Sequence, residues 1–480
     1  MKKFYITTSI AYTNASPHLG HALELVQADV IARYQRILKK DVFFLTGTDE
    51  HGLKIEKTAK KEGKKPIDFV NKISNEFQKL TKLLNISNDD FIRTTDTKRH
   101  IPVVRKVWLE MKKRGDIYKK VYHGLYCWGC ESFISQKDLV DGKCPVHKRK
   151  PEVVDEENYF FRFSKYAKTI RKAIEKDKIE IIPHTRKNEV LGMLGEMKND
   201  VSFSRAKSTL KWGIEVPDDP SQIIYVWVDA LLNYISALGY PKGERFKKYW
   251  PADVHCIGKD ILKFHALIWP AMLLSLGIDL PKKIFVHGFI SVYGEKMSKS
   301  LGNVVDPVEL INKYGTDPLR YYLLREIPAT EDGDFTFEKF KTRYNSELAS
   351  GVGNLLARVR AMAEMVGFKK GEIRGIKTAI KKTEDNYKKA MKEFRFHEAL
   401  KSVWDLIGFS DKLIEKEKPW EKKKRSPQVI GSLLSVLDEI SRLLNPFLPD
   451  TAMKISKEIE RDERSGKFKN KRGKVLFPRI

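Results

Sequence analysis

The first fifty residues constrain the fold more than any other part of this 480-residue chain. The run FYITTSI at 4–10 has the composition of a buried strand, and a helical pattern follows from Leu19 to Leu38. A second strand pattern, DVFFLTG, occupies 41–47. A strand, a helix and a strand with short connections open a parallel α/β sheet, which binds ligands at the carboxyl ends of its strands. We therefore predict functional residues just after residues 10 and 47.

Three further apolar segments, at 223–228, 254–257 and 284–286, predict later strands of the same sheet. Before them, residues 115–222 contain clustered Cys, Gly and Pro and only short strand patterns, which indicates an insertion into one split sheet. From Ser346 onward the apolar residues recur with helical spacing, which predicts a terminal helical bundle. The predicted boundaries are 1–114, 115–222, 223–327, a linker at 328–345, and 346–480.

The overall charge is consistent with a nucleic-acid partner but does not establish one. The chain carries 90 Lys and Arg against 63 Asp and Glu, a net charge of +27. A solvated Lys-rich surface explains that excess equally well, because residues 361–480 carry only +11 where an even spread gives about +7. Four cysteines are too few for a disulfide scaffold, so we expect a cytoplasmic protein. The longest apolar stretch, 266–278, contains Pro270 and is too short to span a membrane, so we expect no membrane association.

The first chemical signal is HLGH at 18–21, where the first loop enters the helix. His18 and His21 are three residues apart and share one helix face. A helix amino terminus favours phosphate, and imidazole donors can bond oxygens that gain charge during transfer. Gly20 lacks a Cβ and would let a flat base approach. This composition gives roughly 0.015 chance matches to the pattern, so two purely structural histidines are the weaker interpretation.

The second signal is KMSKS at 296–300, between Gly294 and Gly302, which predicts a mobile loop. Lys296 and Lys299 can reach a polyphosphate, and paired lysines on a closing loop can neutralise charge on phosphate oxygens. Taken alone, such a loop is usually solvated surface. Combined with HLGH, it indicates nucleotide chemistry.

The third signal consists of two close pairs of metal-binding side chains, Cys127 with Cys130 and Cys144 with His147. Three sulfurs and one nitrogen can surround Zn²⁺ tetrahedrally, and four protein ligands leave no open position, so the ion would be structural. We predict one zinc ion, the alternative being reduced thiols in a turn-rich region. The fourth cysteine, Cys256, lies in an apolar strand pattern and is predicted to be a buried small residue.

HLGH and KMSKS together resemble the two signatures of the class I aminoacyl-tRNA synthetases, with Leu19 in place of the isoleucine of HIGH. The resemblance covers essentially the whole chain. It implies a Rossmann-like parallel-sheet catalytic domain, split by a zinc-binding insertion and followed by an α-helical anticodon-binding bundle. It also implies ATP with Mg²⁺, and a transition state of adenylate formation that is stabilised by His18, His21, Lys296 and Lys299. The implied ATP-binding residues are His18, Gly20, His21, Gly258, Asp260, Lys296 and Lys299.

Three blocks look like those of the methionyl-tRNA synthetases: TGTDEHG at 46–52, IYVWVDALLNY at 224–234 and IGKDILKFHALIWP at 257–270. The isoleucyl, valyl and leucyl enzymes need room for an editing insertion, and the cysteinyl enzymes disperse their zinc ligands. By resemblance, Asp49 binds the substrate ammonium. The implied thioether pocket is lined by Ile10, Tyr12, Trp227, Tyr234, Ile261 and His265.

Aromatic walls suit a polarisable thioether, and a Tyr hydroxyl or His265 could donate to its sulfur. Without the resemblance, Trp227 and Tyr234 could be ordinary core aromatics. His265 could equally be a satisfied core histidine.

In the helical part, the resemblance implies that the anticodon is read by Asn354, Arg358, Pro419 and Trp420. Unstacked anticodon bases expose a ring face and hydrogen-bonding edges, which suits an Asn, an Arg and an aromatic. Without the family, such an Asn and Arg pair is usually surface and a lone Trp is usually core. The implied activity is a ligase that joins L-methionine to the 3′-terminal adenosine of tRNA(Met) through methionyl-adenylate. We expect a monomer, because the chain ends after the bundle and many methionyl enzymes dimerise through a further domain.

Two other functions stay open at this point. A small-molecule nucleotidylyltransferase also uses HxGH, but it needs neither the zinc insertion nor the basic bundle. A non-enzymatic RNA-binding paralogue has no need of the histidines and lysines.

Overall fold

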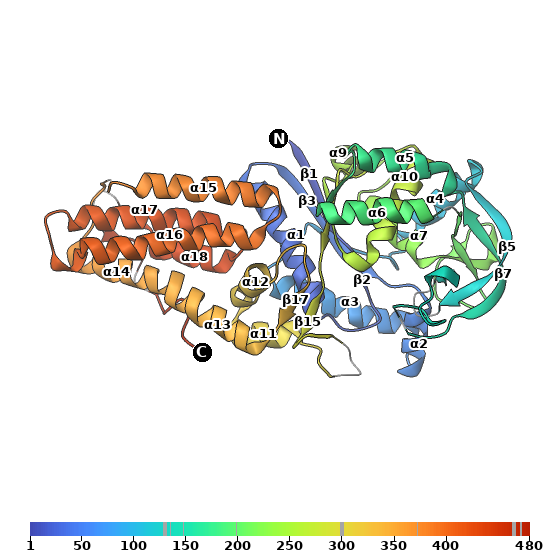
Figure 1. Cartoon of the computed structure of the whole chain (residues 1–480), viewed down its shortest axis with the longest axis horizontal. Coiled ribbons are helices and arrows are strands. Elements are labelled where there is room, and N and C mark those ends of the chain that lie inside the picture. The colour runs from blue at the N-terminus through green and yellow to red at the C-terminus, as the bar shows by residue number, and fades with distance from the viewer. Residues whose placement is uncertain are drawn as a thin grey trace. The chain divides into compact units, whose positions relative to one another are not determined.

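The structure is a computed structural model that describes residues 1–127, 132–134, 136–146, 148–197, 199–297, 302–371, 373–462, 467–470 and 473–480. The chain forms two compact units. Unit 1 consists of Met1–Ser16, Lys40–Lys79 and Asn88–Val286, and unit 2 consists of Pro17–Lys39, Leu80–Ser87 and His287–Ile480. Each unit therefore combines segments that are distant in the sequence, as the mixed blue and green ribbons of unit 1 show in Figure 1.

Unit 1 contains a seven-stranded sheet in the order β2-β3-β1-β13-β14-β8, with β4 also paired to β3. Its strands are β1 (Lys3–Thr8), β2 (Ala11–Tyr12), β3 (Asp41–Asp49), β4 (Asp90–Arg93), β8 (Glu180–Ile182), β13 (Val254–Gly258) and β14 (Lys283–His287). β1 pairs in parallel with β3 and β13, and β14 pairs in parallel with β8. β1 and β13 are almost entirely buried, as strands are in a parallel sheet covered on both faces. The predicted parallel α/β sheet is confirmed.

The strand predicted at 223–228 is wrong. β12 (Asp219–Ile224) covers only the first two residues of that run, and it pairs in an antiparallel sheet with β10 (Ser204–Ala206) and β11 (Glu215–Val216). The rest of the run enters α7 (Val226–Leu231). Burial on all sides removes the periodicity that separates a strand from a helix, so a short apolar run fits either.

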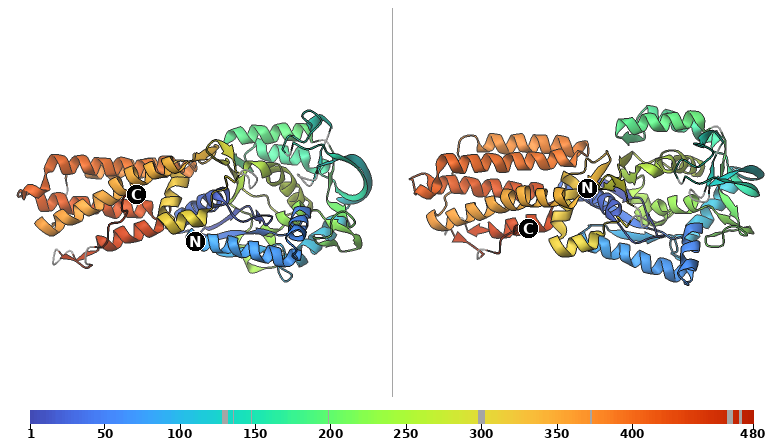
Figure 2. Two further views of the ribbon diagram at one scale, coloured as in Figure 1. Left: turned by 90° about the horizontal axis from the view of Figure 1, so that it is seen from below. Right: turned by 60° about the horizontal axis from the view of Figure 1, so that its bottom comes forward.

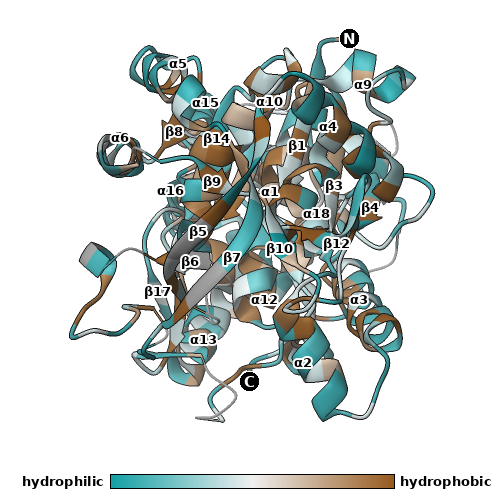
Figure 3. Ribbon diagram, turned by 90° about the vertical axis from the view of Figure 1, so that its right-hand side faces the viewer, coloured by the Kyte–Doolittle hydropathy of each residue, from teal (hydrophilic) through white to brown (hydrophobic). Residues whose placement is uncertain are grey.

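The segment 115–222 contains longer strands than its sequence predicts. β5 (Ile117–Cys127) and β7 (Glu152–Phe161) form an antiparallel ribbon, with β6 (Ser132–Ile134) and β9 (Val201–Ser202) at its sides. Figure 3 shows β5 and β7 side by side, with much of β7 in the teal of hydrophilic residues. The same segment also supplies β8 to the central sheet.

Helices cover the sheet and complete unit 1. They are α2 (Leu53–Lys61), α3 (Pro66–Leu83), α4 (Ile101–Lys113), α5 (Ser164–Glu175), α6 (His184–Glu196), α7, α8 (Asn233–Ser236), α9 (Glu244–Tyr249) and α10 (Trp269–Leu276). One hydrophobic cluster joins the sheet to α4, α5 and α10, for example through Tyr5, Trp108, Ile170 and Trp269. None of the helices in the described part of the chain is long and apolar enough to cross a membrane.

Unit 2 begins with α1 (Leu19–Ile37), which confirms the helix predicted at 19–38. It also contains a small sheet of β15 (Ile290–Val292), β16 (Glu295–Lys296) and β17 (Gly333–Phe335). Along the chain, α11 (Pro307–Tyr314) and α12 (Thr316–Arg325) lie between β16 and β17, and α13 (Phe337–Arg343) follows β17. A fully buried ion pair at 2.8 Å joins Asp29 of α1 to Arg320 of α12. Arg320 also donates to the backbone carbonyls of Pro446 and Phe447. This one guanidinium therefore connects α1 to the last helices of the chain.

The carboxyl-terminal part of unit 2 is helical, as predicted. A π-helix, Tyr344–Gly353, leads into α14 (Asn354–Val366), α15 (Ile376–Lys392), α16 (Phe396–Glu417), α17 (Ser426–Leu444) and α18 (Pro449–Glu458). α16 packs against α15 and α17, and Figure 2 shows these orange-to-red helices side by side in both views. Two short strands, β18 (Arg461–Asp462) and β19 (Lys467–Phe468), follow the bundle.

Candidate active site

The two histidines of HLGH cap the amino terminus of α1. His18 is the N-cap residue, and its Nδ1 accepts a hydrogen bond from the backbone N–H of Gly20 at 3.1 Å. His21 accepts in return, through Nδ1, from the backbone N–H of His18 at 3.2 Å. The two rings lie 3.9 Å apart, so this local exchange of hydrogen bonds fixes both of them.

Both rings are neutral at neutral pH. Burial lowers the pKa of His18 to about 4. Burial lowers the pKa of His21 well below its ordinary value, and the neighbouring His18 and His287 lower it further. Because Nδ1 of each ring accepts from a backbone N–H, the single proton of each neutral ring sits on Nε2. His18 and His21 are therefore hydrogen-bond donors through Nε2.

The helix terminus differs from the expectation in one respect. The N–H groups of Gly20 and His21 are engaged by Nδ1 and the carbonyl of His18, so an anion meets the imidazole donors rather than these backbone groups. A Cβ at Gly20 would lie 3.0 Å from Cε1 of His18 and 4.0 Å from Cε of Met297. The glycine therefore makes room for the capping ring.

Within unit 2, the structure brings part of KMSKS next to HLGH. Met297, the second residue of the motif, is the neighbour of Gly20 described above. Lys296 is exposed at the end of β16, and its carbonyl accepts from Asn303 at 3.2 Å. Lys299 lies outside the described residues.

Glu24 and His287 join this site, although the sequence analysis did not select them. Nε2 of His287 lies 2.9 Å from a carboxylate oxygen of Glu24, and Nδ1 lies 2.8 Å from the carbonyl of Gly288. Both ring nitrogens face acceptor oxygens, which is the arrangement of a protonated imidazole. Glu24 is one helical turn after His21, so the spacing along α1 could have revealed it.

In unit 1, the predicted ammonium ligand Asp49 ends the central strand β3. β2 pairs with this end, so that Tyr12 lies opposite Asp49. The carbonyl of Asp49 accepts from the backbone N–H of Thr13 at 2.9 Å and from its hydroxyl at 3.0 Å. Asp49 is 8% exposed, which holds a carboxylate at the carboxyl edge of the sheet, where such sheets bind ligands.

The predicted pocket residues pack on one hydrophobic cluster of unit 1. Tyr234 belongs to its buried core, and the partly buried residues packed against it include Ile10, Tyr12, Trp227 and Ile261. Trp227 stacks on Phe264 with ring centres 3.9 Å apart, and it forms a T-shaped pair with His265 with ring centres 6.2 Å apart. Phe264 was missed, although it directly precedes His265.

His265 uses both ring nitrogens within the protein. Nδ1 lies 3.0 Å from the carbonyl of Ile261 and must donate to it, so in the neutral ring Nε2 accepts from the Tyr234 hydroxyl at 2.7 Å. Behind them, His255 accepts from Trp269 at 3.3 Å and lies 2.7 Å from the Thr7 hydroxyl. Burial lowers the pKa of His255 well below its ordinary value, and His265 adds to that effect. The two donors that the sequence predicts near the methionine sulfur, the Tyr234 hydroxyl and His265, are thus bonded to each other.

The predicted ribose-binding residues lie at the end of β13 and just after it. Gly258 is the buried last residue of that strand, and Asp260 is exposed in the short 3₁₀ turn Lys259–Ile261. Both therefore lie at the carboxyl end of a central strand, as the prediction required.

Half of the predicted zinc site lies within the described residues. Cys127 ends β5 and Cys144 follows the bridge between Val140 and Lys143. Both thiols are buried and neither forms a disulfide, which fits the reduced sulfur ligands that zinc prefers. The other two predicted ligands, Cys130 and His147, lie outside the described residues. No cluster of three or more potential metal ligands occurs among the residues that are described.

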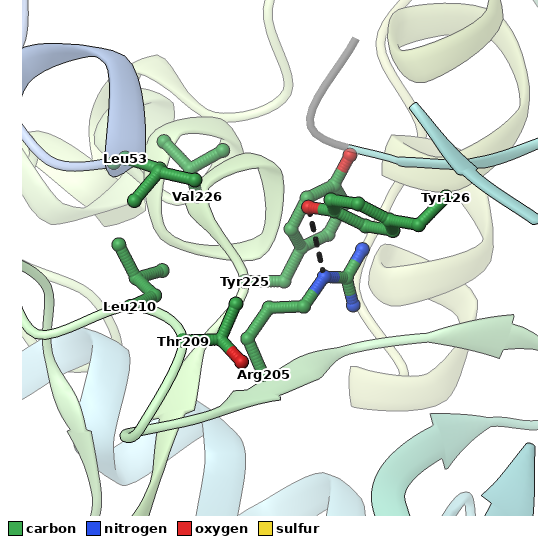
Figure 4. Close-up of a pocket in the computed structure, with 8 residues that line it drawn as sticks. Leu53, Tyr126, Arg205, Thr209, Leu210, Tyr225 and Val226 are labelled. Carbon is green, nitrogen blue, oxygen red and sulfur yellow. Dashed lines mark hydrogen bonds between the residues drawn. The ribbon is translucent and has the colours of Figure 1, made fainter. Parts of the chain in front are cut away.

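A small pocket that the sequence analysis did not predict lies beside these segments (Figure 4). Arg205 is buried within it, with its guanidinium 4.4 Å from the ring centre of Tyr225 and its Nε donating to the Tyr126 hydroxyl at 3.3 Å. The lining residues are Gly52, Leu53, Tyr126, Arg205, Thr209, Leu210, Tyr225 and Val226. Among its lining residues, Tyr126 directly precedes Cys127 and Val226 directly precedes Trp227 in the sequence.

The predicted anticodon residues of unit 2 lie on two elements, α14 and the 3₁₀ turn Pro419–Glu421. Asn354 begins α14 and is exposed, and α14 packs against the 3₁₀ turn Pro419–Glu421. Trp420 is 39% exposed, so its ring has an open face. Arg358 is engaged by two carboxylates of α16, Asp411 at 3.2 Å and Glu415 at 2.6 Å.

Family models match both parts of the chain. Residues 4–149 and 136–360 match the model of tRNA synthetases class I (M), and residues 374–473 match the anticodon-binding domain of tRNA ligase. Together with the parallel sheet and the capping histidines, these matches show that the chain is a class I tRNA synthetase.

Individual relatives narrow this class. A methionine–tRNA ligase of Thermotoga maritima is 42% identical and covers 99% of this chain and 78% of its own length. That of Rhizobium meliloti is 43% identical over 94% of this chain and 90% of its own length. The structure of Mycobacterium tuberculosis methionyl-tRNA synthetase in complex with methionyl-adenylate has a TM-score of 0.92 at 37% identity and covers 100% of both chains. The chain therefore belongs to the methionine–tRNA ligases, and its activity is the ligation of methionine to tRNA.

Proposed function

We propose that the chain activates L-methionine with ATP to methionyl-adenylate and then transfers it to the 3′-terminal adenosine of tRNA(Met). The methionine carboxylate attacks the α-phosphorus, pyrophosphate leaves, and no covalent enzyme intermediate forms. The tautomer of His18 and His21 carries this proposal, because two neutral Nε2–H donors on one helix end suit phosphate oxygens that gain charge in the transition state. Mg²⁺ bound with ATP neutralises part of the triphosphate charge.

The remaining ATP contacts are proposed from the family. Gly20 leaves room for the capping ring of His18, and Gly258 and Asp260 hold the ribose at the end of β13. Lys296 and Lys299 hold the leaving pyrophosphate. We expect alanine at Lys299 to lower the rate of pyrophosphate exchange by about 10²-fold while the methionine KM changes little. Similar losses in rate and methionine affinity would contradict that role.

Methionine is proposed to bind with its ammonium on Asp49 and its thioether against Trp227, Tyr234 and His265. The walls of Ile10, Tyr12 and Ile261 complete the pocket, which is supported by their packing on one cluster. Since the Tyr234 hydroxyl donates to His265, its proton is not available to the sulfur, and the aromatic faces carry much of the affinity for the thioether.

The α-helical bundle is proposed to bind the tRNA anticodon. The exposed ring of Trp420 can stack an unpaired base, Pro419 shapes that turn, and Asn354 with Arg358 can reach base edges. To bind RNA, Arg358 must break its ion pairs with Asp411 and Glu415. We retain the domain boundaries of the sequence analysis as part of this proposal.

One structural zinc ion is proposed in the connective insertion. Cys127 and Cys144, two buried reduced thiols, would hold it together with Cys130 and His147. When bound, the ion would supply a fold-stabilising link between two turns and no chemistry of transfer. One zinc per chain by elemental analysis, lost on Cys144→Ser, supports this proposal, and a metal-free native chain would contradict it.

A cytoplasmic, monomeric enzyme stays a prediction of the sequence analysis. The small number of cysteines supports a reducing compartment. Sedimentation of the chain at micromolar concentration tests the monomer, and a stable dimer there would contradict it.

Pyrophosphate exchange with each of the twenty amino acids tests the specificity. We expect exchange with methionine well above the others. Exchange with another amino acid and not with methionine would refute the proposed pocket.

A further inference from the structure

A buried network of hydrogen bonds lies in unit 1 beside the residues that are proposed to bind methionine. Nδ1 of His51 lies 2.7 Å from one carboxylate oxygen of Asp229, and Nε2 of His100 lies 2.7 Å from the other. Nδ1 of His100 continues to the Ser236 hydroxyl at 2.7 Å. Asp229 is 1% exposed and His100 is fully buried, so water does not compete for these bonds.

The hydrogen-bond network joins the two sides of the proposed methionine pocket. His51 is two residues after Asp49, in the loop that follows β3, and Asp229 is two residues after Trp227 on α7. His100 is the N-cap residue of α4. The Asp229 carboxylate therefore links the loop of the ammonium ligand to the helix of the aromatic wall, and links both to α4.

Asp229 is held in its charged form. Burial by itself would raise the pKa of Asp229, but the charges and hydrogen bonds of His51 and His100 keep the pKa below its ordinary value. A charged carboxylate inside a protein interior is expensive unless it is paired, and one that is kept paired on both oxygens imposes a fixed geometry on its partners.

The loop of Asp49 is anchored separately on its other side. Glu50 is fully buried and binds Arg93 of β4 through both carboxylate oxygens, at 2.7 and 2.9 Å. Thr48 donates to the same carboxylate at 2.7 Å. These bonds tie the loop to β4, whereas the bond from His51 to Asp229 ties it to α7.

We propose that Asp229 is a positioning residue for methionine: through His51 it sets the Asp49 carboxylate at a fixed place relative to Trp227, so that ammonium and thioether are bound together. This inference rests on the proposed roles of Asp49 and Trp227. Asp229 touches no substrate in this account and acts only through the residues it holds.

The test compares methionine with 4-(methylthio)butanoate, which has the thioether and carboxylate but no ammonium. The inhibition constant of the analogue divided by the dissociation constant of methionine measures the contribution of the ammonium. We expect Asp229→Asn in the full chain to raise the methionine KM by about tenfold, with kcat and the ATP KM within about twofold, and to reduce that ratio. Equal weakening of both ligands, or an unchanged methionine KM, would overturn the proposal.

Two single-histidine variants separate positioning from folding. His51→Gln breaks the link to the Asp49 loop, so it should reduce the ratio as Asp229→Asn does. His100→Gln leaves that link in place, so it should lower the melting temperature and keep the ratio within about twofold of the wild-type value. Equal changes of the ratio in both variants would show that the hydrogen-bond network serves folding alone.

A matched control removes a different buried carboxylate of unit 1. Asp116 is fully buried and accepts from Lys165 at 2.7 Å and from the Ser275 hydroxyl at 2.7 Å. In the sequence, it lies far from the residues that are proposed to bind methionine. Asp116→Asn should lower the melting temperature without changing the ratio, and a reduced ratio there would contradict the specificity of the effect.

A last variant separates this inference from the proposed function. Asp49→Asn should abolish most of the preference for methionine over the analogue. If it does not, the assignment of Asp49 fails whatever Asp229 does. If it does while Asp229→Asn leaves the ratio unchanged, only the inference about Asp229 fails.

Discussion

Two pairs of histidines illustrate how one residue type is prepared for two tasks. His18 and His21, in unit 2, each hold a backbone N–H on Nδ1, so their protons sit on Nε2. In unit 1, Nε2 of His255 accepts from the Trp269 N–H, and Nε2 of His265 accepts from the Tyr234 hydroxyl. The partner of one nitrogen thus decides which nitrogen carries the proton.

The difference follows from the local backbone. At the start of α1, unsatisfied N–H groups need acceptors, and imidazole Nδ1 provides them, which leaves a donor for a ligand. In the interior around Tyr234, every polar atom needs a protein partner, and the rings are consumed in that network. The first pair suits an anionic phosphate, and the second suits an uncharged thioether.

The largest effect should follow from removing a donor of the first pair. His21→Ala removes one Nε2–H donor that is proposed to bond the developing charge, so we expect pyrophosphate exchange to fall by about 10²- to 10³-fold in kcat. The methionine KM should stay within about threefold, because this pair does not bind the amino acid. Steady-state exchange kinetics check both values, and a raised methionine KM with normal kcat would break the comparison.

Gly20→Ala tests the capping geometry without removing a donor. The added Cβ would lie 3.0 Å from Cε1 of His18, so the ring must shift. We expect kcat to fall by about tenfold, because small misplacements of a catalytic group are costly. The same assay measures the effect, and wild-type kcat in a folded variant would show that the ring tolerates displacement.

Tyr234→Phe should give the opposite kinetic pattern. It removes the hydroxyl that donates to His265 and leaves a buried ring nitrogen without that partner. We expect the methionine KM to rise by about tenfold while kcat changes by less than about threefold. Loss of kcat instead would place this hydroxyl in the chemical step.

The smallest effect concerns stability at low pH. Burial lowers the pKa of His18 from 6.5 to about 4, so between these values the unfolded chain binds a proton that the folded chain does not. The free energy of unfolding therefore falls as the pH is lowered through this window. His18→Asn still caps the helix but cannot titrate.

When the pH is lowered from about 7.5 to about 5, the free energy of unfolding of the wild-type chain should fall by about 1 to 2 kcal/mol more than that of His18→Asn. Urea unfolding at the two pH values measures both losses. Equal losses in the two proteins would mean that folding does not lower the pKa of His18.

Sequence patterns predicted those parts of the molecule that repeat a local rule. The first strand, α1, β13 and β14 were found from periodicity and turn residues, and HLGH was found from its place between strand and helix. α7 was missed because its apolar run has no period.

The contacts inside the site could not be read from the sequence. His287 meets Glu24, which is 263 residues away, and Asp229 meets His51, which is 178 residues away. No local rule relates such positions, because only the completed sheet brings their strands and helices together. The family resemblance supplied residue roles, but the tautomers of His18, His21, His255 and His265 come from the hydrogen-bond partners that the structure gives each ring.

The proton positions can be measured directly in ¹⁵N-histidine-labelled enzyme, with signals assigned by single-histidine variants. At neutral pH, we predict neutral Nε2–H rings for His18 and His21 and neutral Nδ1–H rings for His255 and His265. Imidazolium or Nδ1–H forms of His18 and His21 would contradict the account that these two residues are prepared as neutral donors to phosphate.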